Sequence, residues 1–582
     1  MSVKVLRLKT AGSKPRPAVS SGRETVESFV LVFLLFLVLS LEAEGFVIPT
    51  GSMAPTLMGR HKEVTCPQCG DVYAVNADRE VGSDTPAGPV AGQRIVWGTC
   101  VNCRFPTRID DEPNFQGDRI YVIKTPLSVP FVTGDARLGR WEVAVFKLPE
   151  DPEVRYIKRL VGMPGEVLRI LRGDIRVRPA GGPADAPFRR ALRPLIHQDD
   201  MQMLVYDDSH RPAALDGDPR WKRWAAADSA GWVETKAGTY TISREKGQGW
   251  IDLRYRHVVP DPVQWDALIQ KRPPPHPPRP TLVTDFYSYN TDLTAEAGAH
   301  PLAAMKAWRQ PHWVGDLTLK TRVDVVETVG TLRFELVKAG VPNRCEIDLA
   351  TGLATLSHGE TTLGGPAATG LNQKGAHDLV FSNVDDRLSL RVGGRLPFGD
   401  GRSFDPGDGE GAVSPTAADL EPAAVSSEGA SVEVSGLVLS RDIYYTLDPS
   451  HFDLDGVELN DPLPTDPVAM FDWLGDPRMF PAFGKLGARD FPIAPGRYMM
   501  LGDNSPWSRD GRAWQRPDQV AAGSGGWDDS GREAWEVPES LLIGKAFCVY
   551  WPHLKPFGPT FKLGQDLRLP VRPYLEKIRW IR

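Results

Sequence analysis

The chain has 582 residues, ordinary apolar and charged fractions, and a formal net charge of −6, which together predict a globular protein of two or three folded units. Residues 1–23 carry basic side chains and no acidic one, so the rest of the chain is more acidic than the total suggests. A basic tip on an acidic body argues against nucleic-acid binding and is typical of an orientation signal.

An apolar segment follows the basic tip. Phe29 to Leu41 is almost purely apolar, and extension to 25–47 gives roughly the ~20 residues that cross a bilayer. We therefore expect a cytoplasmic basic tail at 1–24, a transmembrane anchor at 25–47, and the remaining residues on the far side. A cleavable signal peptide and a buried core helix are the alternatives, although Leu-Glu-Ala-Glu-Gly after the apolar core makes a poor cleavage site.

Three blocks farther along carry residues suited to nucleophilic catalysis. The first, 48–57, reads Ile-Pro-Thr-Gly-Ser-Met-Ala-Pro-Thr-Leu and contains Ser52. The second, 143–166, contains Tyr-Ile-Lys-Arg-Leu-Val-Gly-Met-Pro-Gly-Glu with Lys158, and the third, 500–512, reads Met-Leu-Gly-Asp-Asn-Ser-Pro-Trp-Ser-Arg-Asp-Gly-Arg. A serine needs a nearby base to become a nucleophile, and a lysine serves once burial lowers its pKa. Taken singly, the blocks are ordinary turns and a solvated basic pair. Their joint occurrence favours an enzyme in which a lysine activates a serine.

Together the blocks resemble bacterial type I signal peptidases, the Ser/Lys endopeptidases that remove signal peptides from exported proteins. The resemblance implies a β catalytic domain built from 48–180 and 490–582, placed outside the bacterial plasma membrane, with the N-terminus in the cytoplasm. It implies no cofactor for catalysis. The implied partners are the lipid bilayer and the signal peptides of exported preproteins, with no nucleic acid.

The resemblance also implies roles by position. Ser52 attacks the scissile carbonyl, and Lys158 takes the serine proton and passes it to the leaving amine. Ser508 orients the lysine amine, and the Thr50 hydroxyl with the Ser52 backbone N–H forms the oxyanion hole. The third block is stabilised by three of its own residues, Asp503, Asp510 and Arg512. The arginine pairs with a carboxylate. The substrate lies in shallow apolar subsites that accept alanine at the first and third positions before the cut. These subsites are formed by Phe46, Ile48, Pro49, Met53, Leu57, Tyr156 and Ile157.

An insertion at 60–110 carries two CxxC pairs about thirty residues apart. Four thiolates supplied by two such knuckles have the spacing of a structural zinc ribbon. Cysteines outside the cytoplasm tend to oxidise, so two disulfides are the alternative. The candidate zinc ligands are Cys66, Cys69, Cys100 and Cys103.

A second insertion runs from about 181 to 489. Residues 181–280, which include a proline-rich stretch, are predicted as a linker or insert region, and 281–489 as an antiparallel β-sandwich, because short strand-like runs alternate with turn signals. The pattern resembles concanavalin-like or laminin-G-like jelly rolls. Residues 399–429, rich in Gly, Ser, Ala, Pro and acids, predict a long loop. The chain is therefore expected to be mainly β.

The role of the second insertion stays open between a scaffold and a glycan-binding or envelope-binding module. Tryptophans that can stack on sugars are Trp221, Trp232, Trp250 and Trp313. An envelope-binding or glycan-binding surface protein on an inactive peptidase scaffold is therefore an alternative function, although a complete Ser/Lys/Ser set argues against an inert scaffold. A self-cleaving Ser/Lys regulator is disfavoured by the expected anchor and the lack of a DNA-binding segment.

Overall fold

The computed structural model describes most of the chain from Ala43 onward, together with Val26, Phe29 and Val30. The residues it does not describe are 1–25, 27–28, 31–42, 86–87, 91, 125–137, 184, 227–230, 244–248, 295–311, 408–413, 448–466, 481–486, 516–530, 552–553, 564–566 and 574. The predicted basic tail and most of the predicted anchor therefore lie outside the described residues. Within the described part, no helix has both the length and the apolar composition to cross a bilayer.

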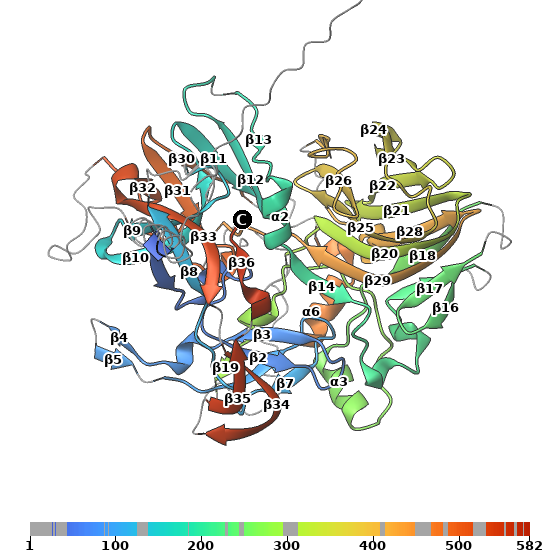
Figure 1. Cartoon of the computed structure of the whole chain (residues 1–582), viewed down its shortest axis with the longest axis horizontal. Helices are drawn as coiled ribbons and strands as arrows, with labels where there is room; N and C mark the ends of the chain where they lie inside the picture. Colours follow the sequence, from blue (N-terminus) through green and yellow to red (C-terminus); the bar gives the residue numbers. More distant parts are fainter. Residues whose placement is uncertain are drawn as a thin grey trace, which may run out of the picture.

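The fold is mainly β, as predicted (Figure 1). One antiparallel sheet contains parts of the second and third sequence blocks and leads into the first, and we call it the catalytic sheet because these blocks hold the predicted catalytic residues. Its order is β1 (Ala43–Val47), β8 (Arg119–Lys124), β33 (Leu542–Trp551), β9 (Val143–Leu148), β10 (Asp151–Gly162), β31 (Arg497–Leu501) and β32 (Glu536–Pro538), with β36 (Arg579–Trp580) beside β33.

The end of the predicted anchor differs from the structure. Residues 43–47 form strand β1, which pairs with β8 from Ala43 opposite Ile123 to Val47 opposite Arg119. The backbone groups of this segment are satisfied by a neighbouring strand, so it belongs to the catalytic sheet rather than to an apolar helix. The strand thus leads directly into the block that carries Ser52.

A smaller sheet extends the catalytic region beyond β10. Its order is β13 (Arg189–Arg190), β12 (Asp174–Pro179), β11 (Glu166–Leu171) and β30 (Arg489–Pro492). Buried apolar side chains of this sheet, including Leu168 and Phe491, share a core with Met499 and Leu501 of β31. Residues that precede the second insertion in the sequence and residues that follow it therefore pack against the strand that leads into the third block.

The cysteine-containing insertion consists of short hairpins. The pairs are β2 (His61–Thr65) with β3 (Val72–Asn76), β4 (Ser83–Thr85) with β5 (Gly88–Val90), and β6 (Ile95–Thr99) with β7 (Pro106–Arg108). A strand of the second insertion, β19 (Leu293–Thr294), adds to β6. The two insertions are therefore joined through a shared sheet.

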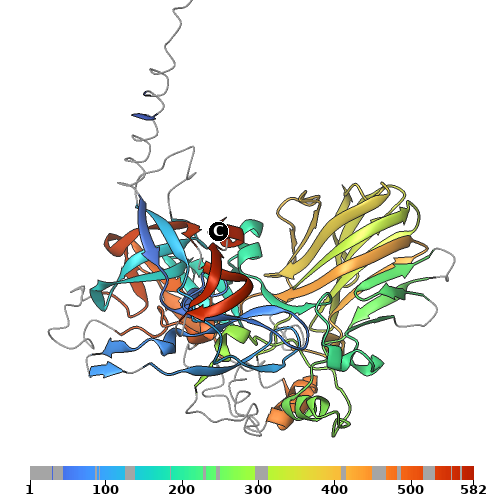
Figure 2. The ribbon, with the colours of Figure 1, turned by 60° about the horizontal axis from the view of Figure 1, so that its bottom comes forward.

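Two antiparallel sheets form the β-sandwich, which lies beside the catalytic sheet (Figures 1 and 2). Their facing side chains, such as Leu319 and Phe334, form one hydrophobic core. The first sheet has the order β16 (Val233–Lys236), β17 (Thr239–Ile242), β29 (Ser431–Arg441), β20 (Leu317–Glu327), β25 (Gly375–Val384), β26 (Arg387–Val392) and β27 (Arg402–Ser403), with β14 (Met203–Asp207) beside β29. The second has the order β15 (Trp224–Ala226), β18 (Ile251–Tyr255), β28 (Ala423–Glu428), β21 (Thr331–Lys338), β22 (Val341–Asp348), β23 (Leu353–His358) and β24 (Thr361–Ala368).

Residues 181–280, predicted as a linker or insert region, supply five strands of the sandwich. Strands β14 to β18 all come from this region, together with helices α2 (Leu195–Asp200) and α3 (Pro262–Ile269). Strand β28 also differs from prediction, since it lies within the predicted loop at 399–429 and pairs with β18 and β21. The remaining elements include helix α6 (Pro467–Leu474) and the hairpin of β34 (Leu554–Leu563) and β35 (Leu567–Pro573).

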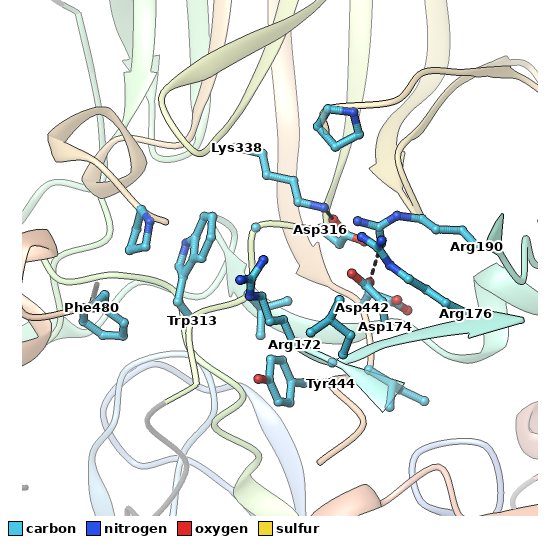
Figure 3. Close-up of a pocket in the computed structure, with 17 residues that line it drawn as sticks. Arg172, Asp174, Arg176, Arg190, Trp313, Asp316, Lys338, Asp442, Tyr444 and Phe480 are labelled. Atoms are coloured by element: carbon cyan, nitrogen blue, oxygen red, sulfur yellow. Dashed lines mark hydrogen bonds and ion pairs between the residues drawn. The ribbon is translucent and has the colours of Figure 1, made fainter. Parts of the chain in front are cut away.

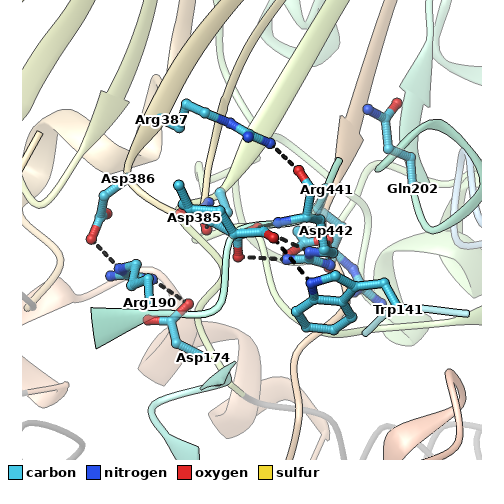
Figure 4. Close-up of polar contacts among 12 residues, drawn as sticks. Trp141, Asp174, Arg190, Gln202, Asp385, Asp386, Arg387, Arg441 and Asp442 are labelled. Carbon is cyan, nitrogen blue, oxygen red and sulfur yellow. Dashed lines mark hydrogen bonds and ion pairs between the residues drawn. The ribbon is translucent and has the colours of Figure 1, made fainter. Parts of the chain in front are cut away.

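Buried ion pairs fasten the sandwich to the catalytic region (Figure 4). Arg193, which precedes α2, donates to Asp385 in the β25–β26 turn and to Asp442 after β29. Arg190 on β13 pairs with Asp174 and with Asp386. Loss of one partner from a buried pair leaves the other charge uncompensated, so these contacts hold the two bodies in one arrangement.

Candidate active site

The structure brings Ser52 and Lys158 together. Ser52 lies in the 3-10 turn η1 (Gly51–Met53), which follows β1, and Lys158 lies on β10. The distance from Lys158 Nζ to Ser52 Oγ is 2.6 Å. The serine is 9% exposed and the lysine 4%, so the hydrogen bond between them is shielded from water.

Burial changes the chemistry of the lysine amine. The apolar surroundings lower the pKa of Lys158 from 10.5 to about 8, an effect that Asp510 and Asp503 partly oppose and Arg512 reinforces. Removal of water disfavours the charged form of an amine. An appreciable fraction of this lysine is therefore neutral near physiological pH, which a general base requires.

Ser508 lies in the same buried region but makes no hydrogen bond to the lysine. The residue is 0% exposed, and its Oγ has no hydrogen-bond partner among the described residues. A Cβ atom added at Gly502 would lie 2.1 Å from Ser508 Oγ and 2.4 Å from the carbonyl oxygen of Ser52. Glycine at 502 is thus the residue that lets the third block approach the nucleophile this closely.

Arg159, which was not among the residues predicted for the site, contributes to it. Successive strand residues point to opposite faces, so Arg159 points away from Ser52 and donates to Asp503 at 2.7 and 2.6 Å. Both side chains are 0% exposed. The predicted structural role of Asp503 therefore has a specific partner in Arg159.

Asp510 and Arg512 form a second buried pair within the third block. The guanidinium of Arg512 donates to the Asp510 carboxylate at 2.8 and 2.6 Å, and the same carboxylate accepts from the backbone N–H of Gly502 at 3.0 Å. Arg512 also donates to Ser505 Oγ at 2.7 Å. These bonds fix the loop that carries Ser508.

Asn504 connects the third block to the turn that carries Ser52 through two hydrogen bonds. Its backbone N–H donates to the carbonyl oxygen of Ser52 at 3.1 Å, and its side-chain Nδ2 donates to the carbonyl oxygen of Gly51 at 3.1 Å. The sequence analysis treated this residue as part of a turn only. Nothing in the sequence around Asn504 indicates that its side chain contacts Gly51, which lies 453 positions away in the chain.

The residues predicted for substrate contact divide into two groups. Ile48, Met53 and Leu57 are buried in the core under the catalytic sheet, so they form the floor rather than the open surface of any subsite. Partly or fully exposed positions next to the dyad are Phe46, Pro49, Thr50, Tyr156 and Ile157. Thr50 has extended backbone geometry (φ −117°, ψ 158°) immediately before the turn of Ser52.

Strands β1 and β10 approach each other although three strands separate them in the sheet order. Arg155 on β10 lies over the ring of Phe46 on β1, 5.4 Å from its centre, and pairs with Glu44. The sheet is therefore curled, and Ser52, which follows β1, meets Lys158 on β10.

The four cysteines of the CxxC pairs converge. Each pair occupies the turn of a hairpin, Cys66 and Cys69 between β2 and β3, and Cys100 and Cys103 between β6 and β7. All four sulfur atoms lie within 4.8 Å of one another and are buried, and the shortest separations are 3.5 and 3.6 Å across the two hairpins. A disulfide requires about 2.05 Å, whereas four converging thiolates fit tetrahedral zinc.

A separate pocket lies between the β11–β12 hairpin and the sandwich (Figure 3). Charged side chains within it pair with one another, as Lys338 does with Asp316 and Arg190 with Asp174. Trp313 and Tyr444 form part of its wall. Neither Ser52 nor Lys158 reaches this pocket.

The tryptophans considered for sugar stacking are mostly enclosed. Trp221 and Trp232 are 5% and 4% exposed, each within a hydrophobic core. The ring of Trp250 is covered by Arg333, whose guanidinium carbon lies 4.0 Å from the ring centre. Trp221 and Trp232 therefore present no open ring face for a sugar, and one face of the Trp250 ring is covered.

Comparison with known proteins adds family information. The family model "Signal peptidase, peptidase S26" matches residues 106–206. Signal peptidase I of Pseudomonas fluorescens is 30% identical over 141 residues, and that of Pseudomonas aeruginosa is 28% identical over 141 residues; each alignment covers 24% of this chain and 32% of the relative. The chain thus spans about a third of the length of these curated relatives.

Among solved structures, carbohydrate binding module CBM66 from Bacillus subtilis is similar at 10% identity and a TM-score of 0.20, over 38% of this chain and 96% of that one. A TM-score this low carries no argument about the insertion. The family match contains Lys158, and the site geometry joins that lysine to Ser52 from outside the matched region. Over the matched residues the chain is similar to signal peptidase I, and it carries extra regions outside them.

Proposed function

We propose that the protein is a membrane-bound serine endopeptidase that removes N-terminal signal peptides from exported preproteins, with Ser52 as nucleophile and Lys158 as general base. The observation that carries the proposal is the 2.6 Å hydrogen bond between a buried serine and a buried lysine. The signal peptidases to which the chain is similar support the substrate class. The location follows from the expected anchor: the bacterial plasma membrane, with the catalytic region outside the cytoplasm.

The proposed mechanism uses only side chains and backbone groups of this chain. Ser52 Oγ attacks the scissile carbonyl while its proton passes to neutral Lys158 Nζ, and the resulting ammonium then protonates the leaving amine. The Ser52 backbone N–H and the Thr50 hydroxyl stabilise the oxyanion; one such donor is typically worth about 10²–10³ in rate. Water, deprotonated by Lys158, then hydrolyses the acyl-enzyme.

Ser508 completes the proposed mechanism. A buried hydroxyl without a partner is costly, and the neutral amine has two hydrogens, of which one is donated to the carbonyl oxygen of Ile157 at 3.1 Å. Rotation of the Ser508 side chain so that its Oγ accepts the second hydrogen would leave the lone pair of Lys158 directed at Ser52. Small subsites beside Phe46 and Ile157 would favour alanine at the first and third positions before the cut.

The experiment that tests the function is cleavage by the full chain in detergent. A peptide that spans an Ala-X-Ala processing site is incubated with the protein, and the products are identified by mass spectrometry. We expect one cut, directly after the second alanine. A peptide with leucine at both small-residue positions serves as the control and should remain intact; uniform cutting of both peptides, or of neither, would rule the assignment out.

The lowered pKa of Lys158 predicts the pH dependence. Because only the neutral amine accepts the serine proton, kcat/KM should be low at pH 6 and rise through a pKa of about 8. The same depressed pKa means that the unfolded chain binds more protons than the folded one between about 8 and 10.5, so the cost of this buried lysine to folding decreases as the pH rises to about 10.5. A pH profile from 6 to 10 checks the first point; a profile with no rise below pH 10 would contradict it.

The converging cysteines predict a structural zinc ion. We expect metal analysis of the purified chain to give one zinc per molecule, held by Cys66, Cys69, Cys100 and Cys103. Cys66→Ser should lose the zinc and lower the melting temperature, because structural zinc supplies folding energy. Cys345→Ser, at a buried cysteine of the sandwich core, is the matched control and should retain the metal. Disulfides found by mass spectrometry in place of zinc would refute this prediction.

A further inference from the structure

A segment of the second insertion lies against the nucleophile turn. The 3-10 turn η5 (Ser288–Asn290) precedes β19, and its residues Tyr289 and Asn290 are 0% and 4% exposed. The adjoining strand β19 lies among the cysteine hairpins, where it pairs with β6 (Figure 1). The sandwich is therefore joined to the rest of the chain through residues packed at the catalytic serine.

Tyr289 packs directly on Gly51, the residue before the nucleophile. A Cβ atom added at Gly51 would lie 2.1 Å from Tyr289 Cε1, so the ring occupies the space that any other residue at 51 would need. The Tyr289 hydroxyl donates to the carbonyl oxygen of Arg60 at 3.0 Å. One side chain of the insertion thus contacts the chain on both sides of Ser52.

Asn290 acts on the same turn through Asn504. The two side-chain amides form a reciprocal pair, with each Nδ2 donating to the partner's Oδ1 at 2.8 Å. Asn504 Nδ2 also donates to the carbonyl oxygen of Gly51 at 3.1 Å. A buried amide whose polar groups are hydrogen-bonded holds one orientation. Asn290 therefore fixes the rotamer in which Asn504 Nδ2 donates to the carbonyl oxygen of Gly51.

The other end of the insertion reaches the same loop. Thr446, which follows β29 by five residues, donates its backbone N–H to Ser505 Oγ at 2.9 Å and accepts from Arg512 at 2.7 Å. Thr291 Oγ1, next to Asn290, accepts from the backbone N–H of Thr99 at 2.9 Å. Two separate segments of the insertion, at 288–291 and at Thr446, therefore contact the third block, the turn of Ser52 or the cysteine hairpins.

We infer that Asn290 is a positioning residue of the proposed Ser52–Lys158 dyad, supplied by the second insertion. Its role is to hold Asn504, and through it the Gly51–Ser52 backbone, at the distance that gives the short serine–lysine hydrogen bond. The insertion is then a required part of the active site. The inference rests on the proposed peptidase function.

The test measures peptide cleavage by full-length Asn290→Ala, Asn504→Ala and the double variant. A displacement of the nucleophile by about 1 Å can cost about 10²-fold in rate, so we expect Asn290→Ala to lower kcat by about 10- to 100-fold with KM unchanged within about twofold. Because Asn290 acts through Asn504, the double variant should lose no more activity than Asn504→Ala alone.

The matched control is Asn343→Ala in the sandwich. Asn343 is also a buried asparagine, and its Nδ2 donates to the carbonyl oxygen of Leu336 at 3.2 Å, far from the dyad in the fold. We expect this change to lower the melting temperature as Asn290→Ala does but to leave kcat unchanged. Unaltered kcat in Asn290→Ala, or losses that multiply in the double variant, would overturn the inference while leaving the proposed function intact. An inactive wild-type chain would overturn both.

Discussion

Ser52→Ala and Lys158→Ala should each lower kcat for peptide cleavage by at least about 10⁴-fold, which is the scale seen when one member of a nucleophile–base unit is removed. The first variant removes the attacking oxygen, and the second leaves the serine hydroxyl without a base at 2.6 Å. Because the two groups act as one unit, the double variant should be no less active than either single one. The measurement is kcat for peptide cleavage at saturating substrate and pH 9.

Stability distinguishes these variants from simple unfolding. A buried lysine with a pKa of about 8 is mostly charged at neutral pH, at some cost to folding. Lys158→Met should therefore melt no lower than wild type at pH 7 although it is inactive. Lys236→Ala, at an exposed lysine of strand β16, is the control and should keep full activity. Substantial cleavage by Ser52→Ala would eliminate Ser52 as the nucleophile.

The second large effect is expected at Arg159. Arg159→Met leaves the carboxylate of Asp503 buried without its cation, and breaking such a pair typically costs about 3–5 kcal/mol. The arginine also donates to Thr56 Oγ1 at 3.0 Å and to the carbonyl oxygen of Trp141, so the loss extends to the floor of the site. Thermal unfolding followed by circular dichroism should show a clear fall in melting temperature.

Two companion variants make this result specific. Arg159→Met combined with Asp503→Leu removes both charges and should recover most of the lost stability. Arg322→Met breaks an exposed pair with Asp378, whose side chains are 57% and 76% exposed; such pairs contribute only about 0–1 kcal/mol. Equal effects at Arg159 and Arg322 would mean that the buried pair is not what holds the third block.

The large insertion shows where sequence patterns misled. Residues 423–428, Ala-Ala-Val-Ser-Ser-Glu, lie in a stretch with the composition of a loop, yet they form the inner strand β28 between β18 and β21. Small side chains suit a strand that is buried on both faces, and composition alone does not report that burial. The same limit applies to 181–280, where short strands and a proline-rich stretch gave the appearance of a linker.

The cysteine spacing was more informative. Four thiols in two CxxC turns predict one cluster, and the structure places all four sulfur atoms within 4.8 Å. Nothing in the spacing indicated that β19 of the second insertion would complete the sheet of β6 and β7. A two-residue strand has too little pattern to be recognised, and its pairing depends on tertiary packing.

By itself, the sequence determined the chemistry of the proposed site: Ser52, Lys158 and the third block are recognisable because a nucleophile, its base and a supporting loop need particular residue types in local motifs. The tertiary structure decided what surrounds them. The Arg159–Asp503 pair, the grip of Asn504 on Gly51 and the contacts of Tyr289 and Asn290 join residues separated by 214 to 453 positions. Such contacts depend on burial and on the meeting of distant chain segments, and single-residue patterns along the chain carry no record of either.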